Sequence, residues 1–341
     1  MDKKRTYLFL LLTVVLVAGI ILDIYIGSAK ISISDIWNII TGRISDTPEA
    51  YIVHQIRFPR VIVALLAGVS LSIAGLQMQT VFRNPLAGPY VLGISSGSSL
   101  GVALVLLGSS VFGYTFGGFM GDLGIIIAAL AGAAFILMLV LFVSVRVKDV
   151  MTILILGILF GGATSAVVSV LQFFSDEFAL KSYVVWTLGS LSGVSVEQLS
   201  MIVPIVITGI LISFALSKRL DVYLLGETYA KSLGSNVFMI RLFVFISTCL
   251  LAGTITAFCG PIGFVGIAAP HISRMMFKTS KHLYLMTATI LTGGIMMIAS
   301  DIISQLPGTE KVLPINSVTA LLGIPVVVWI IFKNFKYSKA V

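Results

Sequence analysis

Side chains that could carry a reaction are scarce in this chain of 341 residues, which holds 14 acidic residues, three histidines and two cysteines. Cys249 and Cys259 lie deep in one apolar segment and are too few to indicate disulfides or a metal site. The phosphate-binding pattern G-x-x-x-x-G-K-[ST] does not occur, so the chain lacks the loop with which many ATPases hold nucleotide. The sequence therefore predicts no catalytic residue, no metal site and no cofactor.

The composition indicates the environment that must position the remaining polar residues. Hydrophobic residues make up 58% of the chain and charged residues 11%, whereas soluble domains carry about 25% charged residues. A spanning helix needs roughly 20 apolar residues, and the chain has room for about ten. Because lipid cannot satisfy backbone groups, the long continuous apolar runs favour helices. We expect one all-α membrane domain over residues 1–341, in contact with the lipid bilayer.

The apolar runs predict ten crossings. The first is too long for a signal peptide and has no clean cleavage site after it. The eighth is short and broken by two prolines and three glycines, and such backbone needs a cover of protein or a water-filled cavity. Residues 182–193 are too short to cross and predict a short helix at the outer surface or a re-entrant piece. The predicted spans are 7–27, 57–82, 90–107, 123–145, 150–174, 198–217, 242–258, 260–274, 283–303 and 313–332.

Small residues recur at four-residue spacing in two of these spans. They predict helix faces that approach one another closely in lipid. The residues are Gly93, Gly97 and Gly101 in the third span and Gly157 and Gly161 in the fifth.

The longest polar interruption of the second half is residues 218–236, here called the elbow. The apolar residues Leu225, Tyr229 and Leu233 recur every four positions, a spacing that is typical of an amphipathic helix. Gly226 breaks this pattern and Gly234 stands where a helix C-cap is favoured, so the sequence predicts two short helices. The elbow is either an amphipathic loop lying on the membrane or a docking surface for another protein.

Basic residues give the orientation. With ten spans and a cytoplasmic N-terminus, sixteen of the 22 Lys and Arg residues and four of the 14 acidic residues fall inside. Both termini and the elbow are then cytoplasmic. The net charge of +8 is spread among loops and indicates no nucleic-acid partner.

Ionisable residues are nearly absent from the spans. Asp23 and Asp301 fall near outer ends, and Arg57 and Arg60 near an outer start. A gradient-driven secondary transporter usually needs ionisable groups within its spans, so this class is disfavoured. A structural or sensor protein is disfavoured by the broken eighth crossing and the elbow. These observations favour the docking interpretation of the elbow and a separate motor subunit.

A set of motifs, specific in its combination and order, covers the chain from about residue 57 to residue 333. The motifs are Arg57-Phe58-Pro59-Arg60, Gly75-Leu76-Gln77-Met78-Gln79, Arg83-Asn84-Pro85-Leu86-Ala87-Gly88-Pro89 with Leu92-Gly93, Trp186-Thr187-Leu188-Gly189-Ser190-Leu191, Leu225-Gly226-Glu227 through Ala230 to Leu233-Gly234, Gly260-Pro261-Ile262-Gly263-Phe264-Val265-Gly266 leading to Pro270-His271, Asp301, and Gly323-Ile324-Pro325. With them the chain resembles the permease subunits of FecCD-type ABC importers, which take up ferric siderophores, haem and cobalamin.

The resemblance implies a fold like that of the cobalamin-importer permease, in the inner membrane of a bacterium. It also implies a second permease subunit, either a second copy or a paralogue. Two cytoplasmic ATP-binding subunits and an extracytoplasmic substrate-binding protein complete the expected assembly. A ferric siderophore or related metal chelate is the first expectation for the solute, with haem or cobalamin as the alternative.

The resemblance also assigns roles to residues. The elbow would receive the ATPase through Leu225, Gly226, Glu227, Ala230, Leu233 and Gly234. Asp149, Met151 and Thr152 match a region that closes the inner gate, although a simple structural turn is equally consistent. His271 is expected to be a hydrogen-bonding residue, and His54 and His282 to lie in loops.

Arg57 and Arg60 match a basic pair that such permeases present to acidic residues of the binding protein. The alternative is a pair of arginines that extend to the membrane boundary from the end of a span. Relatives commonly carry a further arginine shortly after the position of Asp301, where this chain has Gln305. Lys311 is the expected substitute for that third contact.

Overall fold

The computed structural model describes residues 3–27, 29, 31–112, 121–147, 149–306 and 312–338, and every regular element within these residues is helical. Seven helices are long and apolar enough to cross a membrane, and two shorter apolar helices accompany them. The broken eighth crossing is a helix of 13 residues. The prediction of an all-α polytopic membrane fold is confirmed, and each of the ten predicted spans overlaps a helix.

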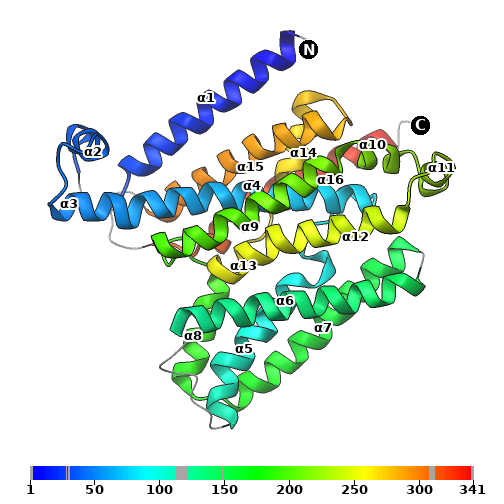
Figure 1. Ribbon diagram of the computed structural model, residues 1–341, viewed down its shortest axis with the longest axis horizontal. Helices are drawn as coiled ribbons and strands as arrows, with labels where there is room; N and C mark the ends of the chain where they lie inside the picture. Colours follow the sequence, from blue (N-terminus) through cyan, green and yellow to red (C-terminus); the bar gives the residue numbers. More distant parts are fainter. Residues whose placement is uncertain are drawn as a thin grey trace.

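The helices follow the chain as labelled in Figure 1. They are α1 (Lys3–Tyr25), α2 (Ile33–Ile40), α3 (Pro48–Tyr51), the π-helix η1 (Ile52–Arg57), α4 (Phe58–Val81), the 3-10 helix η2 (Pro89–Leu92), α5 (Ile94–Phe112), α6 (Gly121–Arg146), α7 (Val150–Phe174), α8 (Glu177–Leu188), α9 (Val196–Ala215), α10 (Ser217–Leu224), α11 (Glu227–Ser232), α12 (Val237–Thr248), the π-helix η3 (Cys249–Gly253), α13 (Thr254–Cys259), α14 (Val265–Phe277), α15 (His282–Ser304) and α16 (Ile315–Ser338).

Two groups of helices make up the molecule (Figure 1). In the larger group α4 packs against α9, α14 and α15, and α1 and α16 lie against α15. In the smaller group α5 packs against α6, α7 and α8. The groups meet where α6 contacts α13 and η3. The elbow belongs to the larger group, because α10 packs on α4 and α15 and α11 packs on α12.

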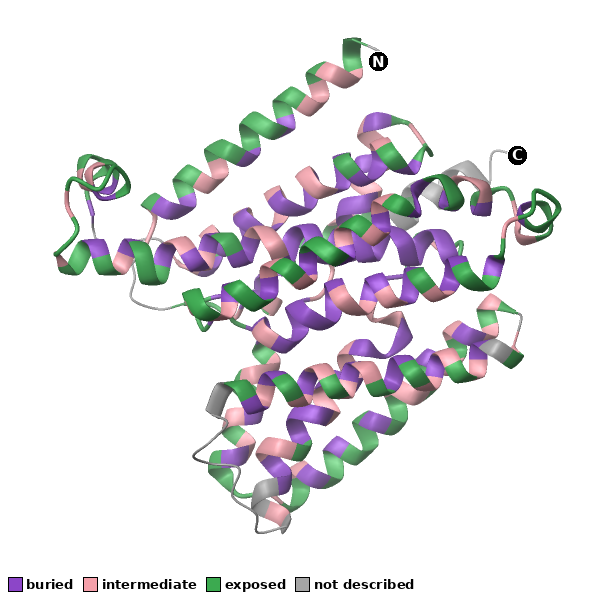
Figure 2. Cartoon of the chain, in the orientation of Figure 1, coloured by how far each residue is buried: buried purple, intermediate pink, exposed green. Residues whose placement is uncertain are grey.

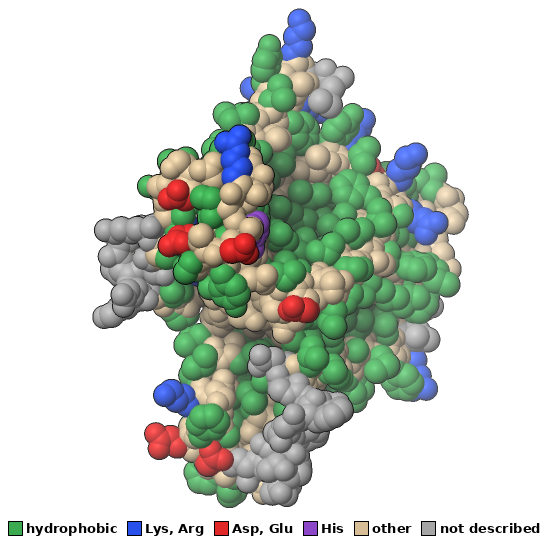
Figure 3. Space-filling view, turned by 60° about the vertical axis from the view of Figure 1, so that its left-hand side comes forward, with side chains coloured by type: hydrophobic (Ala, Val, Ile, Leu, Met, Phe, Trp, Pro, Cys, Tyr) green, Lys and Arg blue, Asp and Glu red, His purple; other side chains and the backbone are tan. Residues whose placement is uncertain are grey.

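Burial is uneven among the helices (Figure 2). The continuous helical run Pro48–Val81 has 83% of its most apolar window buried, whereas the corresponding window of α1 has 22%. Figure 3 shows a broad hydrophobic surface on one face, with Lys and Arg side chains toward its edges. This surface pattern is the one that lipid contact requires.

Close contacts between glycines hold each group together. In the smaller group a Cβ on Gly97 would lie 2.4 Å from the carbonyl oxygen of Gly132, and one on Gly101 would lie 1.9 Å from that of Ala128. Gly157 of α7 approaches η2 equally closely. The predicted packing through small residues is confirmed, because only the lack of a side chain allows these backbones to touch.

In the larger group the closest approach joins α4 to α14. A Cβ on Gly75 would lie 1.7 Å from the carbonyl oxygen of Gly266. One on Gly68 would lie 2.3 Å from that of Gly293 in α15. Helix α4 is therefore held between two neighbours at backbone contact.

Two boundaries differ from the prediction. The second span begins at Pro48, well before residue 57, because Thr47 caps the helix and Pro48 occupies its first turn. The short helix near residue 182 begins at Glu177, because the Asp176 carboxylate accepts a hydrogen bond of 2.8 Å from the Ala179 N–H. In both places the cap residue decides where the helix starts.

Candidate functional site

The elbow contains two short helices, as predicted. α10 ends at Leu224 and α11 begins at Glu227. Gly226 between them has φ +117°, and Gly234 after α11 has φ +77°. Both values lie in the region that glycine adopts without steric cost, so the two glycines permit the turns.

In the part of the chain that the structure describes, one row of apolar side chains on the elbow is more than half exposed. Leu225, Tyr229 and Leu233 are 64%, 52% and 57% exposed. Ala230, expected on the same docking surface, is fully buried in a core that includes Ile240 of α12. The exposed row therefore excludes Ala230, which anchors α11 from beneath.

A buried polar cluster attaches α11 to α10 and α12. The Tyr223 hydroxyl donates to Glu227 Oε1 at 2.8 Å, and Arg241 Nε donates to that hydroxyl at 3.3 Å. Arg241 also forms an ion pair with Glu227. Burial raises the pKa of Tyr223 to about 12, so the phenol stays a hydrogen-bond donor at neutral pH. Glu227, predicted to contact a partner, is thus bound to its own chain.

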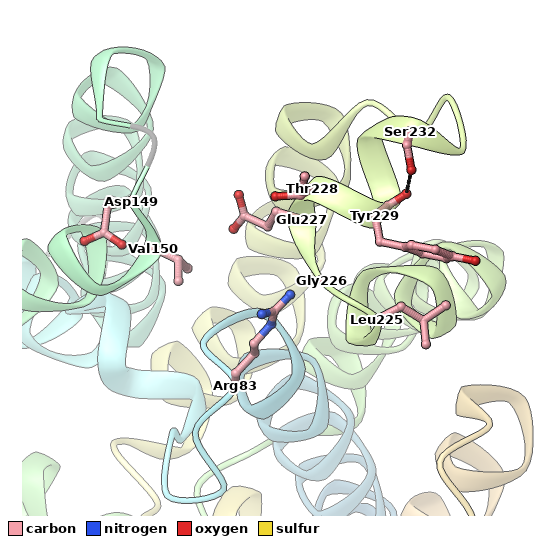
Figure 4. A pocket seen from close by; sticks show the side chains of 9 residues that line it. All are labelled: Arg83, Asp149, Val150, Leu225, Gly226, Glu227, Thr228, Tyr229 and Ser232. Carbon is pink, nitrogen blue, oxygen red and sulfur yellow. Dashed lines mark hydrogen bonds between the residues drawn. The ribbon is translucent and has the colours of Figure 1, made fainter.

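A pocket of about 690 Å³ opens between the elbow and the first residues of α7 (Figure 4). Arg83, at the end of α4, extends into it and is held by a hydrogen bond of 3.2 Å from Nη2 to the Tyr223 carbonyl. Asp149 and Val150 form the wall opposite the elbow. The full lining is Arg83, Asp149, Val150, Leu225, Gly226, Glu227, Thr228, Tyr229 and Ser232.

Of the residues predicted as a gate, Asp149 caps α7, and Met151 and Thr152 lie in its first turn. The Asp149 carboxylate accepts hydrogen bonds from the Thr152 N–H at 2.9 Å and the Thr152 hydroxyl at 2.7 Å, with a longer one from the Met151 N–H. The bonds from Thr152 hold the pKa of Asp149 below its ordinary value. Met151 is 51% exposed. The structure brings Asp149 and the elbow together on one pocket, which the sequence did not predict.

Arg57 and Arg60 lie at the end of the larger group opposite the elbow, here called the far end. The Arg57 side chain is buried and donates to the carbonyl oxygens of Ile24 at 2.7 Å and Tyr25 at 3.0 Å, and also to that of Ala29. Within this chain the guanidinium of Arg57 thus faces backbone carbonyl groups, whereas the resemblance implied that it faces a binding protein. Arg57 turns inward because the end of α1 leaves carbonyl groups without helical partners.

Arg60 is also committed within the chain. Its guanidinium makes two-pronged hydrogen bonds of 2.7 to 3.0 Å to Asp301, and only 11% of its side chain is exposed. Gln305, where relatives were expected to offer an arginine, donates to Asp23 at 2.8 Å and more distantly to Asp301. Gln305 thus bridges two buried carboxylates. Lys311, the expected substitute, lies outside the described residues.

His282 was missed by the sequence analysis, which expected it in a loop. It is 1% exposed and begins α15. Its ring bonds to Asp221 of α10 and to Thr80 of α4, which are 61 and 202 residues away. No local sequence pattern connects residues so far apart.

Comparison with known proteins decides the family. A model of the FecCD transport family matches residues 15–333. The chain belongs to the FecCD transport family. An ABC transporter permease protein of Methanocaldococcus jannaschii is 33% identical to it over 91% of either chain. The vitamin B12 import permease BtuC of Salmonella typhi is 34% identical over 83% of this chain and 84% of its own length.

Solved structures agree. This FecCD-family chain matches a metal-chelate-type ABC transporter in an inward-facing conformation with a TM-score of 0.82 and 28% identity, over 96% of this chain and 99% of the other. PsaBC of Streptococcus pneumoniae, at a TM-score of 0.54 and 14% identity, shares the fold alone. The resemblance inferred from the motifs is confirmed, and the chain is a membrane permease of the ABC importer type.

Proposed function

We propose that this permease moves a ferric siderophore or a related metal chelate across the cytoplasmic membrane of a bacterium, driven by ATP hydrolysis on a separate subunit. The observation that supports this most directly is the exposed row Leu225, Tyr229 and Leu233 beside the pocket. Tyr229 lies on α11, and Leu225 and Leu233 lie next to its two ends; a short apolar surface of this kind suits a groove on a partner. We assign this surface, with Gly226 and Gly234 as its turns, to the ATP-binding subunit.

The attachments of the elbow support a mechanical role. Arg83 ties α10 to the end of α4, and the Tyr223–Glu227–Arg241 cluster ties α11 to α12. A partner that pulls on the exposed row would therefore move helices and not a loose loop. Rigid-body displacement of packed helices is a common way to couple two sites.

The proposed assembly contains a second permease subunit, two ATP-binding subunits and an extracytoplasmic substrate-binding protein. The excess of basic residues on one side favours a cytoplasmic elbow with both termini on the same side. The binding protein then approaches the far end. Arg57 and Arg60 shape that surface through their internal bonds and do not contact the partner as free charges.

Cobalamin, with haem, is the second candidate for the solute. The BtuC relatives are named for vitamin B12 import, whereas the solved structure that covers nearly the whole chain is named for a metal chelate. We favour the chelate on the breadth of that structural match. Binding measurements of ferric siderophore, haem and cobalamin to the substrate-binding protein that associates with this chain separate the three.

The ATPase assignment is tested with Leu233→Asp. The permease is purified from membranes with its associated ATP-binding subunit, and ATP hydrolysis is measured in reconstituted vesicles. We expect the variant to insert normally and to lose stimulated hydrolysis, because a buried carboxylate without a partner is costly at an apolar contact. Lys231→Asp places a carboxylate two residues before Leu233 but outside the exposed row and is the matched control. Unchanged hydrolysis in Leu233→Asp defeats the assignment.

A further inference from the structure

His282 joins three helices at the elbow end of the larger group. The backbone N–H of His282 and its ring Nδ1 both lie 2.7 Å from Asp221 Oδ1, and its Nε2 lies 2.9 Å from Thr80 Oγ1. His282 and Thr80 are each 1% exposed. Asp221 belongs to α10, Thr80 to α4 and His282 to α15, so one ring bridges the elbow and two membrane helices.

The chemistry of the three groups fixes this bridge. A carboxylate only accepts hydrogen bonds, so Nδ1 carries a hydrogen and donates a hydrogen bond to Asp221. No side chain of its own caps the first turn of α15, and Asp221 supplies that cap from α10 by accepting the His282 N–H. A shift of α10 therefore pulls on both the ring and the end of the α15 backbone.

Helices α4 and α15 remain attached along their whole length. At the middle, Gly68 meets Gly293 at backbone contact, and the Ser72 hydroxyl donates to the Thr289 carbonyl at 3.1 Å. At the far end, the two helices are joined by the ion pair of Arg60 with its carboxylate partner on α15. The two helices thus form one unit that runs from the elbow to the far end, here called the α4–α15 pair.

We propose that His282 is a positioning residue that makes a displacement of α10 move the α4–α15 pair as one body. This inference rests on the proposed function, in which an ATP-binding subunit displaces the elbow. It goes further by naming the route to the far end, where a binding protein would dock. The juxtaposition that carries it is Asp221, His282 and Thr80 at the meeting point of three helices.

A hydrolytic role for the same trio is excluded by its surroundings. Threonine, histidine and aspartate in this order could form a nucleophile, a general base and the carboxylate that orients the base. The Thr80 hydroxyl, however, is enclosed within α4 and also bonds to the Leu76 carbonyl of its own helix at 3.0 Å. A substrate has no access to it.

The test follows two labelled positions in the reconstituted complex with its ATP-binding subunit. In a Cys249→Ser background, an environment-sensitive fluorophore is attached at Lys231→Cys in the elbow or at Ile303→Cys, a 42% exposed position near the far end of α15. ATP with vanadate is then added. In the parent we expect both reporters to respond.

Asp221→Ala removes the carboxylate that accepts from the His282 backbone and ring. We expect the elbow reporter to respond as before, while the response at residue 303 falls about tenfold, within the range by which single contacts change the coupling between sites. Asp221→Asn keeps an oxygen that accepts both bonds and should retain the response. Asp221→Ser, whose shorter side chain does not reach the ring, should give the same loss and serves if Asp221→Ala fails to fold. Thr287→Val, on an exposed face of α15, is the matched control.

Several outcomes overturn the inference. A full response at residue 303 in both Asp221→Ala and Asp221→Ser shows that the bridge transmits nothing. A parent whose elbow reporter responds while residue 303 does not shows that the displacement stops at the elbow. A parent in which neither reporter responds, with ATP hydrolysis proceeding, refutes the proposed docking surface and this inference with it.

Discussion

Arg60 in α4 and Asp301 in α15 form a two-pronged ion pair although 241 residues separate them in the chain. Asp301 is fully buried, and the Ser304 hydroxyl adds a further acceptor for the guanidinium at 3.1 Å. Breaking such a pair leaves one charge buried without a partner. The intact pair contributes little net stability to the far end. Removing one of its partners, however, would destabilise the far end strongly.

Asp301→Asn should destabilise the permease by about 3–5 kcal/mol, because Arg60 then keeps a buried charge without its carboxylate. Thermal unfolding in detergent measures the change. Arg43→Met, which removes an exposed arginine in the loop before α3, is the control and should leave the midpoint unchanged. A midpoint in Asp301→Asn equal to that of the parent contradicts the structural role of the pair.

Arg60→Glu tests whether Arg60 acts through its ion pair within the chain or through direct contact with the binding protein. Because the guanidinium faces Asp301 and not the solvent, we expect reduced thermal stability together with a loss of binding-protein affinity that depends little on salt. A contact between exposed charges would instead weaken mainly at low ionic strength. Titration of the binding protein at low and high salt decides between them, and a strong salt dependence restores direct contact by Arg60.

Gly75→Ala should destabilise the protein by about 1–3 kcal/mol or prevent insertion of α14, since its Cβ would overlap the Gly266 carbonyl. Gly162→Ala is the control, because a Cβ at Gly162 in α7 meets nothing within 4 Å and alanine favours the helix by roughly 0.5–1 kcal/mol. Thermal unfolding of both variants gives the comparison. Equal midpoints would mean that α4 and α14 do not meet at backbone distance.

Asp149 can be tested as a helix cap against its predicted role in a gate. Asp149→Ala should speed amide hydrogen exchange in the first turn of α7, and Asp149→Ser should restore protection, because serine also caps a helix. Hydrogen exchange followed by mass spectrometry reports on both. If Ser restores protection but solute transport stays impaired, the negative charge has a second role in the gate.

The positions of the crossings and the elbow followed from local patterns. Continuous apolar runs mark the spans because lipid imposes one solution on the backbone. The period of four at Leu225, Tyr229 and Leu233, interrupted by Gly226 and followed by Gly234, predicted the two elbow helices. Small-residue spacing predicted the glycine contacts of α5 for a similar reason. Small residues four positions apart lie on one face of a helix, so the pattern can be recognised within a short stretch of sequence.

The directions of individual polar side chains could not be predicted. Arg57 turns toward carbonyl groups some 30 residues earlier in the chain, and His282 toward Thr80 more than two hundred residues away. Their partners depend on how helices are arranged in space. The same limit applies to Ala230, whose burial depends on the approach of α12. Motif resemblance drew attention to Arg57 and Ala230 but carried no information on the orientation of their side chains.

The pocket beside the elbow has walls from both groups of helices, since Asp149 caps α7 of the smaller group, Val150 begins it, and the other walls belong to the larger group. A small molecule that filled it would act as a wedge between the two groups. It would also lie beside the surface that we assign to the ATP-binding subunit. Inhibition of uptake by such a compound would need no competition with the solute, and raising the solute concentration would not relieve it.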